Sequence, residues 1–156
     1  MAKEIEHKFL VRTDLLPHKL PAGKRLVQGY LSSDPAVRVR IASDARGAKA
    51  FLTIKGKGLR VRDEFEYEVP VADARAMLKL CGRMTLEKIR RVIGRWELDE
   101  FKGRHKGLWM AEYELKSARE RLPELPEWIG REVTGDSRFT NVRLCAQSFD
   151  KTIFSE

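Results

Sequence analysis

The segment Arg62-Asp-Glu-Phe-Glu-Tyr-Glu-Val69 carries the pattern that decides the fold. Charged side chains at positions 62, 64, 66 and 68 alternate with the apolar Phe65, Tyr67 and Val69. Successive side chains of a β-strand point to opposite faces of the sheet. The segment is therefore predicted to be a strand with one charged face and one apolar face.

The same period recurs along the chain, and turn signals such as Ser32-Ser33-Asp34-Pro35 and Gly56-Lys57-Gly58 interrupt it. Eight strands are predicted, over residues 3–12, 24–32, 36–43, 48–55, 61–69, 87–93, 95–101 and 108–116. So many antiparallel strands in 156 residues favour a barrel or a tightly curved sheet.

Two amphipathic helices are predicted, over residues 72–81 and 141–149, because apolar residues recur there at helical spacing. Residues 123–134 are predicted to form a loop that leads into a short helix. No linker rich in Gly, Pro or Ser divides the sequence. We therefore expect one domain over residues 1–156, of the α+β class but mainly β.

The charge balance limits the classes of partner. There are 31 basic and 23 acidic residues, a net charge of +8, which favours polyanions. Acids and bases are interleaved within short segments, which suits a shaped anion site better than a nucleic-acid footprint. No apolar run is long enough to cross a bilayer, and the first residues lack the apolar core of a signal peptide. A cytoplasmic protein without a membrane partner is expected.

Neither cysteines nor histidines suggest a site. Cys81 and Cys145 lie far apart within apolar patterns, and the three histidines lack metal-ligand spacing. A disulfide framework and a zinc site are therefore not expected.

The charged strand faces allow two interpretations. An antiparallel sheet commonly has one solvated face, so each strand alone is ordinary. However, six segments have polar faces made almost only of charges, and carboxylates that share a strand face repel one another unless a cation lies between them. In the alternative, the strands close into a barrel with the charges inside, and the two helices cover part of the apolar outer face.

An interior of that kind would combine two chemistries. Carboxylate oxygens are hard ligands that suit Mg²⁺ or Mn²⁺, whereas Lys and Arg suit phosphate oxygens. Such a tunnel fits a substrate that arrives as a complex of a metal ion and a short polyphosphate. The sequence contains no Ser/His/Asp or Cys/His set that would indicate a covalent intermediate.

The segment Glu4-Ile-Glu-His-Lys8 matches the Glu-x-Glu-x-Lys signature of the CYTH domain of the triphosphate tunnel metalloenzymes, which this chain resembles. The resemblance continues in order through Arg38-Val-Arg40, Thr53-Ile-Lys55, Arg62 to Glu68, Lys88-Ile-Arg90, Trp96-Glu-Leu-Asp99, Ala111-Glu-Tyr-Glu114 and Pro126 to Thr134. The last motif is similar to the bacterial inorganic triphosphatase branch. His7 and Phe139 depart from residues frequent in that branch, and neither is an expected ligand.

The resemblance implies a closed eight-stranded antiparallel barrel that hydrolyses inorganic triphosphate to pyrophosphate and phosphate with Mg²⁺ or Mn²⁺. The implied metal ligands are Glu4, Glu6, Glu112 and Glu114, with Glu64 and Glu66 as further candidates. The implied phosphate-binding residues are Lys8, Arg38, Arg40, Lys55, Arg62, Lys88 and Arg90. Lys8 or Lys88 is also the candidate for activating water or stabilising the leaving group.

Other functions remain open at this point. A class IV adenylate cyclase or a thiamine triphosphatase would share the fold but need a pocket for an organic group. A non-catalytic polyphosphate- or RNA-binding module would use the basic residues but gains nothing from paired carboxylates. We expect a small polyphosphate substrate, no stable nucleic-acid partner and a homodimer.

Overall fold

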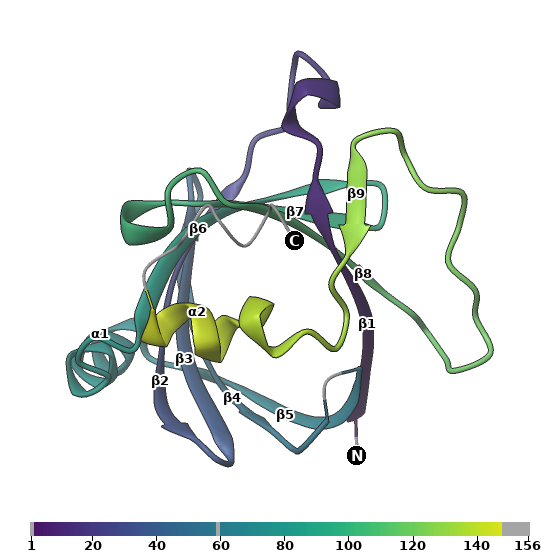
Figure 1. The fold of residues 1–156 in the computed structure, drawn as a ribbon. Helices are drawn as coiled ribbons and strands as arrows, with labels where there is room; N and C mark the ends of the chain where they lie inside the picture. The colour runs from purple at the N-terminus through teal and green to yellow at the C-terminus, as the bar shows by residue number, and fades with distance from the viewer. Residues whose placement is uncertain (1, 59, 148–156) are drawn as a thin grey trace.

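A closed antiparallel β-barrel organises the computed structural model, which describes residues 2–58 and 60–147 (Figure 1). Its eight strands are β1 (Ala2–Val11), β2 (Lys24–Ser33), β3 (Ala36–Asp44), β4 (Gly47–Lys55), β5 (Val61–Val69), β6 (Thr85–Ile93), β7 (Trp96–Phe101) and β8 (Trp109–Glu114). They follow the order β5-β4-β3-β2-β6-β7-β8-β1, and the pairing of β1 with β5 closes the ring. The predicted barrel and the predicted strands are confirmed, with bounds that differ by at most two residues.

Strand β1 carries an additional short strand. One edge of β1 pairs with β8, and the other pairs first with β5 and then with β9 (Ile129–Glu132). The prediction of a short helix at the end of residues 123–134 was therefore wrong. Pairing with β1 and burial of Trp128 and Ile129 stabilise an extended backbone there, although four residues are too few to show a strand period.

Helix α1 (Val71–Leu80) covers part of the outer face of the barrel, as predicted. Ala74 packs with Val39 and Ala50 on the outward side of β3 and β4. The C-terminal end of the helix approaches β2 at Gly29, where a Cβ atom would lie 2.8 Å from Cys81 Sγ. The absence of a side chain at Gly29 thus permits the close contact between the helix and the strand.

Helix α2 (Asn141–Ala146) has a different place from the one predicted. Leu144 and Cys145 pack against Leu10, Leu86 and Met110. These apolar residues lie two positions from Lys8, Lys88 and Glu112, so they share the inward faces of the strands. Together with the 3-10 turn η3 (Ser137–Phe139), α2 therefore lies across one end of the barrel rather than on its outer face (Figure 1). Phe149 of the predicted helix lies outside the described residues.

A third apolar cluster covers the outer face on the far side from α1. Phe9, Trp96, Leu98 and Tyr113 point outward from β1, β7 and β8 and pack against Trp128 at the entry to β9. The segment from η1 (Thr13–Leu15) to β2 adds Leu16 and Leu20 to this cover. On this side, loops and one short strand, rather than a helix, thus cover the apolar outer face of the barrel. Within the described residues, no helix has the length and apolar character needed to cross a bilayer.

Candidate active site in the barrel interior

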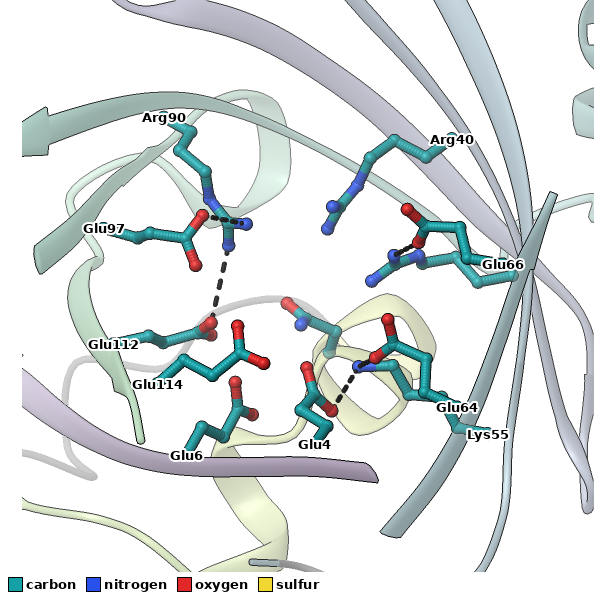
Figure 2. Close-up of a pocket in the computed structure, with 12 residues that line it drawn as sticks. Glu4, Glu6, Arg40, Lys55, Glu64, Glu66, Arg90, Glu97, Glu112 and Glu114 are labelled. Atoms are coloured by element: carbon teal, nitrogen blue, oxygen red, sulfur yellow. Dashed lines mark hydrogen bonds and ion pairs between the residues drawn. The ribbon is translucent and has the colours of Figure 1, made fainter. Parts of the chain in front are cut away.

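The inward strand faces enclose a polar cavity of about 210 Å³ (Figure 2). It is lined by side chains from strands β1 and β3 to β8 and by one residue of α2. These are Glu4, Glu6, Arg38, Arg40, Lys55, Glu64, Glu66, Arg90, Glu97, Glu112, Glu114 and Asn141. The structure thus places the charged strand faces inside the barrel, and the apolar faces of the same strands point outward.

One side of the cavity is an acidic wall, which we define as Glu4, Glu6, Glu97, Glu112 and Glu114. The barrel register puts Glu6 directly opposite Glu114, and Glu97 directly opposite Glu112. Like charges in directly opposed positions destabilise a sheet unless a cation or a base compensates them. Positive charge is therefore needed to offset the repulsion between the carboxylates of the acidic wall.

The carboxylates of the acidic wall differ in how far they are compensated. Burial, together with the nearby Glu112, raises the pKa of Glu6 to about 8. Burial also raises the pKa of Glu114, and Glu4 adds to this effect. In Glu112, burial acts in the same direction, but Lys8 and Arg90 outweigh it and hold the pKa well below its ordinary value. Burial likewise raises the pKa of Glu97. Glu6 and Glu114 are thus the directly opposed pair in which both acids lack sufficient positive charge.

The opposite side is a basic wall, which we define as Arg38, Arg40, Lys55 and Arg90. Arg40 Nε donates to Oε1 of the fully buried Gln28 at 2.8 Å. Burial, helped by repulsion from Arg38 and Arg90, lowers the pKa of Arg40 to about 9. The interior therefore lacks negative charge beside Arg40, which is what an incoming anion would supply.

Ion pairs at the two margins of the cavity connect the walls. Lys55 Nζ lies 2.8 Å from Glu4 Oε2, and Arg90 Nη1 lies 2.9 Å from Glu97 Oε2 (Figure 2). On β5, Glu64 lies 3.5 Å from the Lys55 ammonium, and Glu66 accepts a hydrogen bond from Thr53 Oγ1 at 2.7 Å. Glu64 and Glu66 therefore adjoin the basic wall, which fits the alternative role of positioning basic residues.

The two candidate catalytic lysines lie behind the lining. Lys88 is fully buried, with Nζ 2.7 Å from Asp99 Oδ2, and Asp99 also accepts two hydrogen bonds from Arg90 at 2.7 and 2.8 Å. Burial lowers the pKa of Lys88 to about 8, although Asp99 opposes the shift. For Lys8, Glu112 at 3.6 Å outweighs burial, so the pKa is raised.

The donor set of the acidic wall fits a hard divalent cation. The chemistry is carboxylate oxygen only, and the opposed Glu6 and Glu114 are undercompensated. Within residues 2–58 and 60–147, no three acidic, histidine or cysteine side chains converge closely enough to coordinate an ion as they stand. Side-chain rearrangement would therefore accompany metal binding.

Most of the predicted site residues lie on this one cavity, and three do not line it. Arg62 reaches Glu4 at 3.2 Å and Glu6 at 3.8 Å from the β5 side, whereas Lys8 and Lys88 lie deeper.

Four residues with polar roles in the interior were missed by sequence reasoning. Glu97 and Asp99 share the strand parity of other inward charges, so the alternation in Trp96-Glu-Leu-Asp99 contained the signal. Gln28 is a single amide between apolar positions and gives no pattern. Asn141 belongs to α2, whose position across the barrel end is a tertiary feature that strand periodicity does not carry.

Comparison with known proteins agrees with this geometry. The CYTH domain model matches residues 2–143. The chain is 42% identical to an inorganic triphosphatase of Acetivibrio thermocellus, covering 92% of this chain and 94% of the relative. It is 34% identical to an inorganic triphosphatase of Nitrosomonas europaea, covering 90% and 95%.

Solved structures give the same result. The crystal structure of the inorganic triphosphatase NE1496 aligns with a TM-score of 0.64 and 30% identity, over 94% of this chain and 97% of that one. The PH1012 protein from Pyrococcus horikoshii, at 21% identity and a TM-score of 0.54 over 74% and 79% of the two chains, shares the fold. A barrel with a charged interior, matched over nearly its whole length by one domain model, leaves a single assignment: this chain belongs to the CYTH domain family.

Proposed function

We propose that this protein hydrolyses inorganic triphosphate to pyrophosphate and phosphate with the help of Mg²⁺ or Mn²⁺. The observation that carries the proposal is the polar cavity of the barrel interior, in which an acidic wall faces a basic wall. A small anion that brings its own divalent cation would compensate both walls at once. The activity named for the two relatives at 42% and 34% identity supports the same substrate.

The acidic wall would hold the metal. Glu4, Glu6, Glu112 and Glu114 are the proposed ligands, with Glu64 and Glu66 as further candidates. When bound, the ion would supply charge neutralisation and polarisation of the phosphoryl oxygens. It would also supply the charge that the opposed Glu6 and Glu114 lack.

The basic wall would bind and orient the phosphate chain. Arg38, Arg40 and Arg90 offer planar donor groups, which match phosphate oxygens in pairs, and Lys55 offers a point charge. Arg62 lies beside Glu4 and Glu6, where it would meet both ligand and substrate. Phosphoryl transfer depends mostly on such positioning and charge stabilisation, because little covalent chemistry is asked of the protein.

The two buried lysines would have different roles in the reaction. A pKa of about 8 leaves part of Lys88 neutral near neutral pH, so its amine could accept a proton as water adds to the terminal phosphorus and the bridging P–O bond breaks. Lys8 has a raised pKa and stays charged, which suits it to stabilising the pyrophosphate that leaves.

A screen of phosphate release tests the proposal against its alternatives. Triphosphate, pyrophosphate, ATP and thiamine triphosphate are compared with Mg²⁺, with Mn²⁺ and with excess EDTA. We expect rapid release from triphosphate only when metal is present. Preference for ATP or thiamine triphosphate would favour the cyclase or the thiamine triphosphatase, and tight binding without turnover would favour the non-catalytic module. The cytoplasmic location, the single domain and the homodimer stay predictions.

A further inference from the structure

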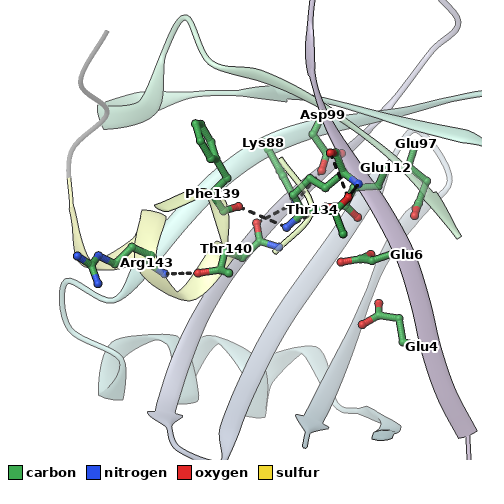
Figure 3. A network of polar contacts seen from close by, with 12 residues as sticks. Glu4, Glu6, Lys88, Glu97, Asp99, Glu112, Thr134, Phe139, Thr140 and Arg143 are labelled. Atoms are coloured by element: carbon green, nitrogen blue, oxygen red, sulfur yellow. Dashed lines mark hydrogen bonds and ion pairs between the residues drawn. The ribbon is translucent and has the colours of Figure 1, made fainter. Parts of the chain in front are cut away.

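The segment that closes one end of the barrel also touches both candidate catalytic lysines (Figure 3). Lys8 Nζ donates to the backbone carbonyl of Phe139 at 3.3 Å. Lys88 Nζ donates to Asn141 Oδ1, also at 3.3 Å. The segment from η3 to α2 is therefore part of the polar interior as well as an apolar cover.

Asn141 is the one member of the cavity lining within the described residues that carries no charge. An ammonium group has only donors, so the contact with Lys88 fixes the carbonyl oxygen of the Asn141 amide toward the lysine. The NH₂ group of the amide is then left for another acceptor. Nδ2 donates to no protein acceptor within residues 2–58 and 60–147, although the residue lines the cavity.

The backbone holds this amide in a fixed place. Thr140 Oγ1 accepts from Arg143 N at 3.3 Å and donates to Ser137 O at 2.9 Å, which defines the start of α2. Leu144 and Cys145 are buried in the apolar cluster that contains Leu10 and Met110, which anchors the same helix against the barrel end. A short, two-torsion side chain on an anchored backbone is well suited to precise binding.

We propose that Asn141 is a substrate-binding residue that also positions Lys88. Its Nδ2 donates a hydrogen bond to a phosphoryl oxygen of the bound triphosphate, while its Oδ1 keeps the Lys88 ammonium aligned. The inference rests on the proposed function and deepens it. A neutral amide serves here because a carboxylate would repel phosphate and another cation would compete with Lys88 for Asp99.

The test is a cycle of variants, Asn141→Ala, Lys88→Met and the double variant, each assayed for triphosphate KM and for triphosphate Kd by calorimetry. We expect Asn141→Ala to raise Kd and KM about tenfold, the loss expected for one hydrogen bond to a charged group. In the Lys88→Met background, Asn141→Ala should still raise Kd several-fold. Arg143→Ala is the matched control, because this exposed residue lies on the same helix and should leave both constants unchanged.

Three results would overturn the proposal. One is an unchanged Kd in Asn141→Ala, and another is a double variant that binds triphosphate as well as Lys88→Met does, since Asn141 would then act only through the lysine. If Asn141→Ala does not fold, Asn141→Asp keeps an acceptor for Lys88 and removes the donor, so binding at the wild-type level would equally refute it. Wild-type protein that binds triphosphate without hydrolysing it would refute the proposed function, while Kd would still test Asn141.

Discussion

The two walls of the cavity differ in how their charges are held. Each cation of the basic wall has a protein partner: Arg38 donates to Thr53 and Arg40 to Gln28, while Arg90 is held by Asp99 and Lys55 by Glu4. In the acidic wall, Glu6 and Glu114 face each other directly, and both have raised pKa values. The basic wall is thus pre-organised, whereas the acidic wall is completed only by an added cation.

This difference explains how strands of similar composition take different roles. A hydrogen-bonded guanidinium costs little to align when an anion arrives, because its orientation is already set. Opposed carboxylates store repulsion that a divalent cation relieves on binding. The two walls should therefore respond differently to mutation.

Glu114→Gln should have the largest effect. The variant is nearly isosteric but replaces an undercompensated carboxylate with a neutral amide, so kcat on triphosphate should fall on the order of 100-fold. Higher Mg²⁺ should restore part of the activity, because the lost function is metal affinity. A metal titration of kcat measures this, with circular dichroism as the folding control. If the variant kept the wild-type kcat at low Mg²⁺, Glu114 would not be a metal ligand.

Asp99→Asn should damage the support of the basic wall. The carboxylate holds both Arg90 and Lys88 and is almost fully buried, so its neutralisation leaves two buried cations undercompensated. We expect a loss of about 3 kcal/mol in the free energy of unfolding, measured by urea denaturation. A raised KM that added Mg²⁺ does not correct should accompany it. Unchanged stability would show that Arg90 and Lys88 do not depend on Asp99.

Arg40→Ala should weaken substrate binding alone. Removing one charged donor to phosphate should raise KM about tenfold to 100-fold, and kcat should change little. Extra metal should give no rescue, in contrast to Glu114→Gln. Gln28→Leu is the informative companion, because it leaves the guanidinium in place but removes its partner and should raise KM less. Metal rescue of Arg40→Ala would contradict the division into two walls.

The smallest effect concerns the pH dependence of the acidic wall without metal. The pKa of Glu6 is about 8 in the folded protein, whereas the ordinary value for a glutamate is 4.5, so the folded state binds this proton more tightly than the unfolded state. The resulting stabilisation is complete below the unfolded value and is lost as pH rises to about 8. The contribution should decline by roughly 1.4 kcal/mol per pH unit within that window.

Melting temperatures of metal-stripped protein across this window provide the measurement. Glu6→Gln should abolish the contribution, so the difference between variant and wild type should change with pH, and saturating Mg²⁺ should suppress it. A pH-independent difference would show that Glu6 is compensated in some other way. The basic wall supplies the contrast, since Arg40→Ala should add no step between pH 4.5 and about 8.

The strands and their inward charges were predictable because alternation is a local property of the sequence. Residues 61–69 and 87–93 show it plainly. The number of such strands favoured a barrel or a tightly curved sheet, and the family resemblance implied the closed ring that the structure has. The positions of β9 and α2 were not predictable, because both depend on burial against distant strands. Trp128 packs against Trp96, and Leu144 packs in the cluster of Leu10. For the same reason, strand alternation put Glu114 on a charged strand face, whereas no local pattern marked Asn141.

Because η3 and α2 lie across one end of the barrel, access to the interior is from the other end. At the other end, inward-facing Lys24, Val92 and Glu114 are exposed at the ends of their strands. A linear phosphate chain would therefore enter end-first, and both products would have to leave past the residues that admitted it. A cyclic phosphate, which has no free end, would be excluded by shape rather than by charge. Pyrophosphate still in the entrance would therefore delay the binding of the next substrate.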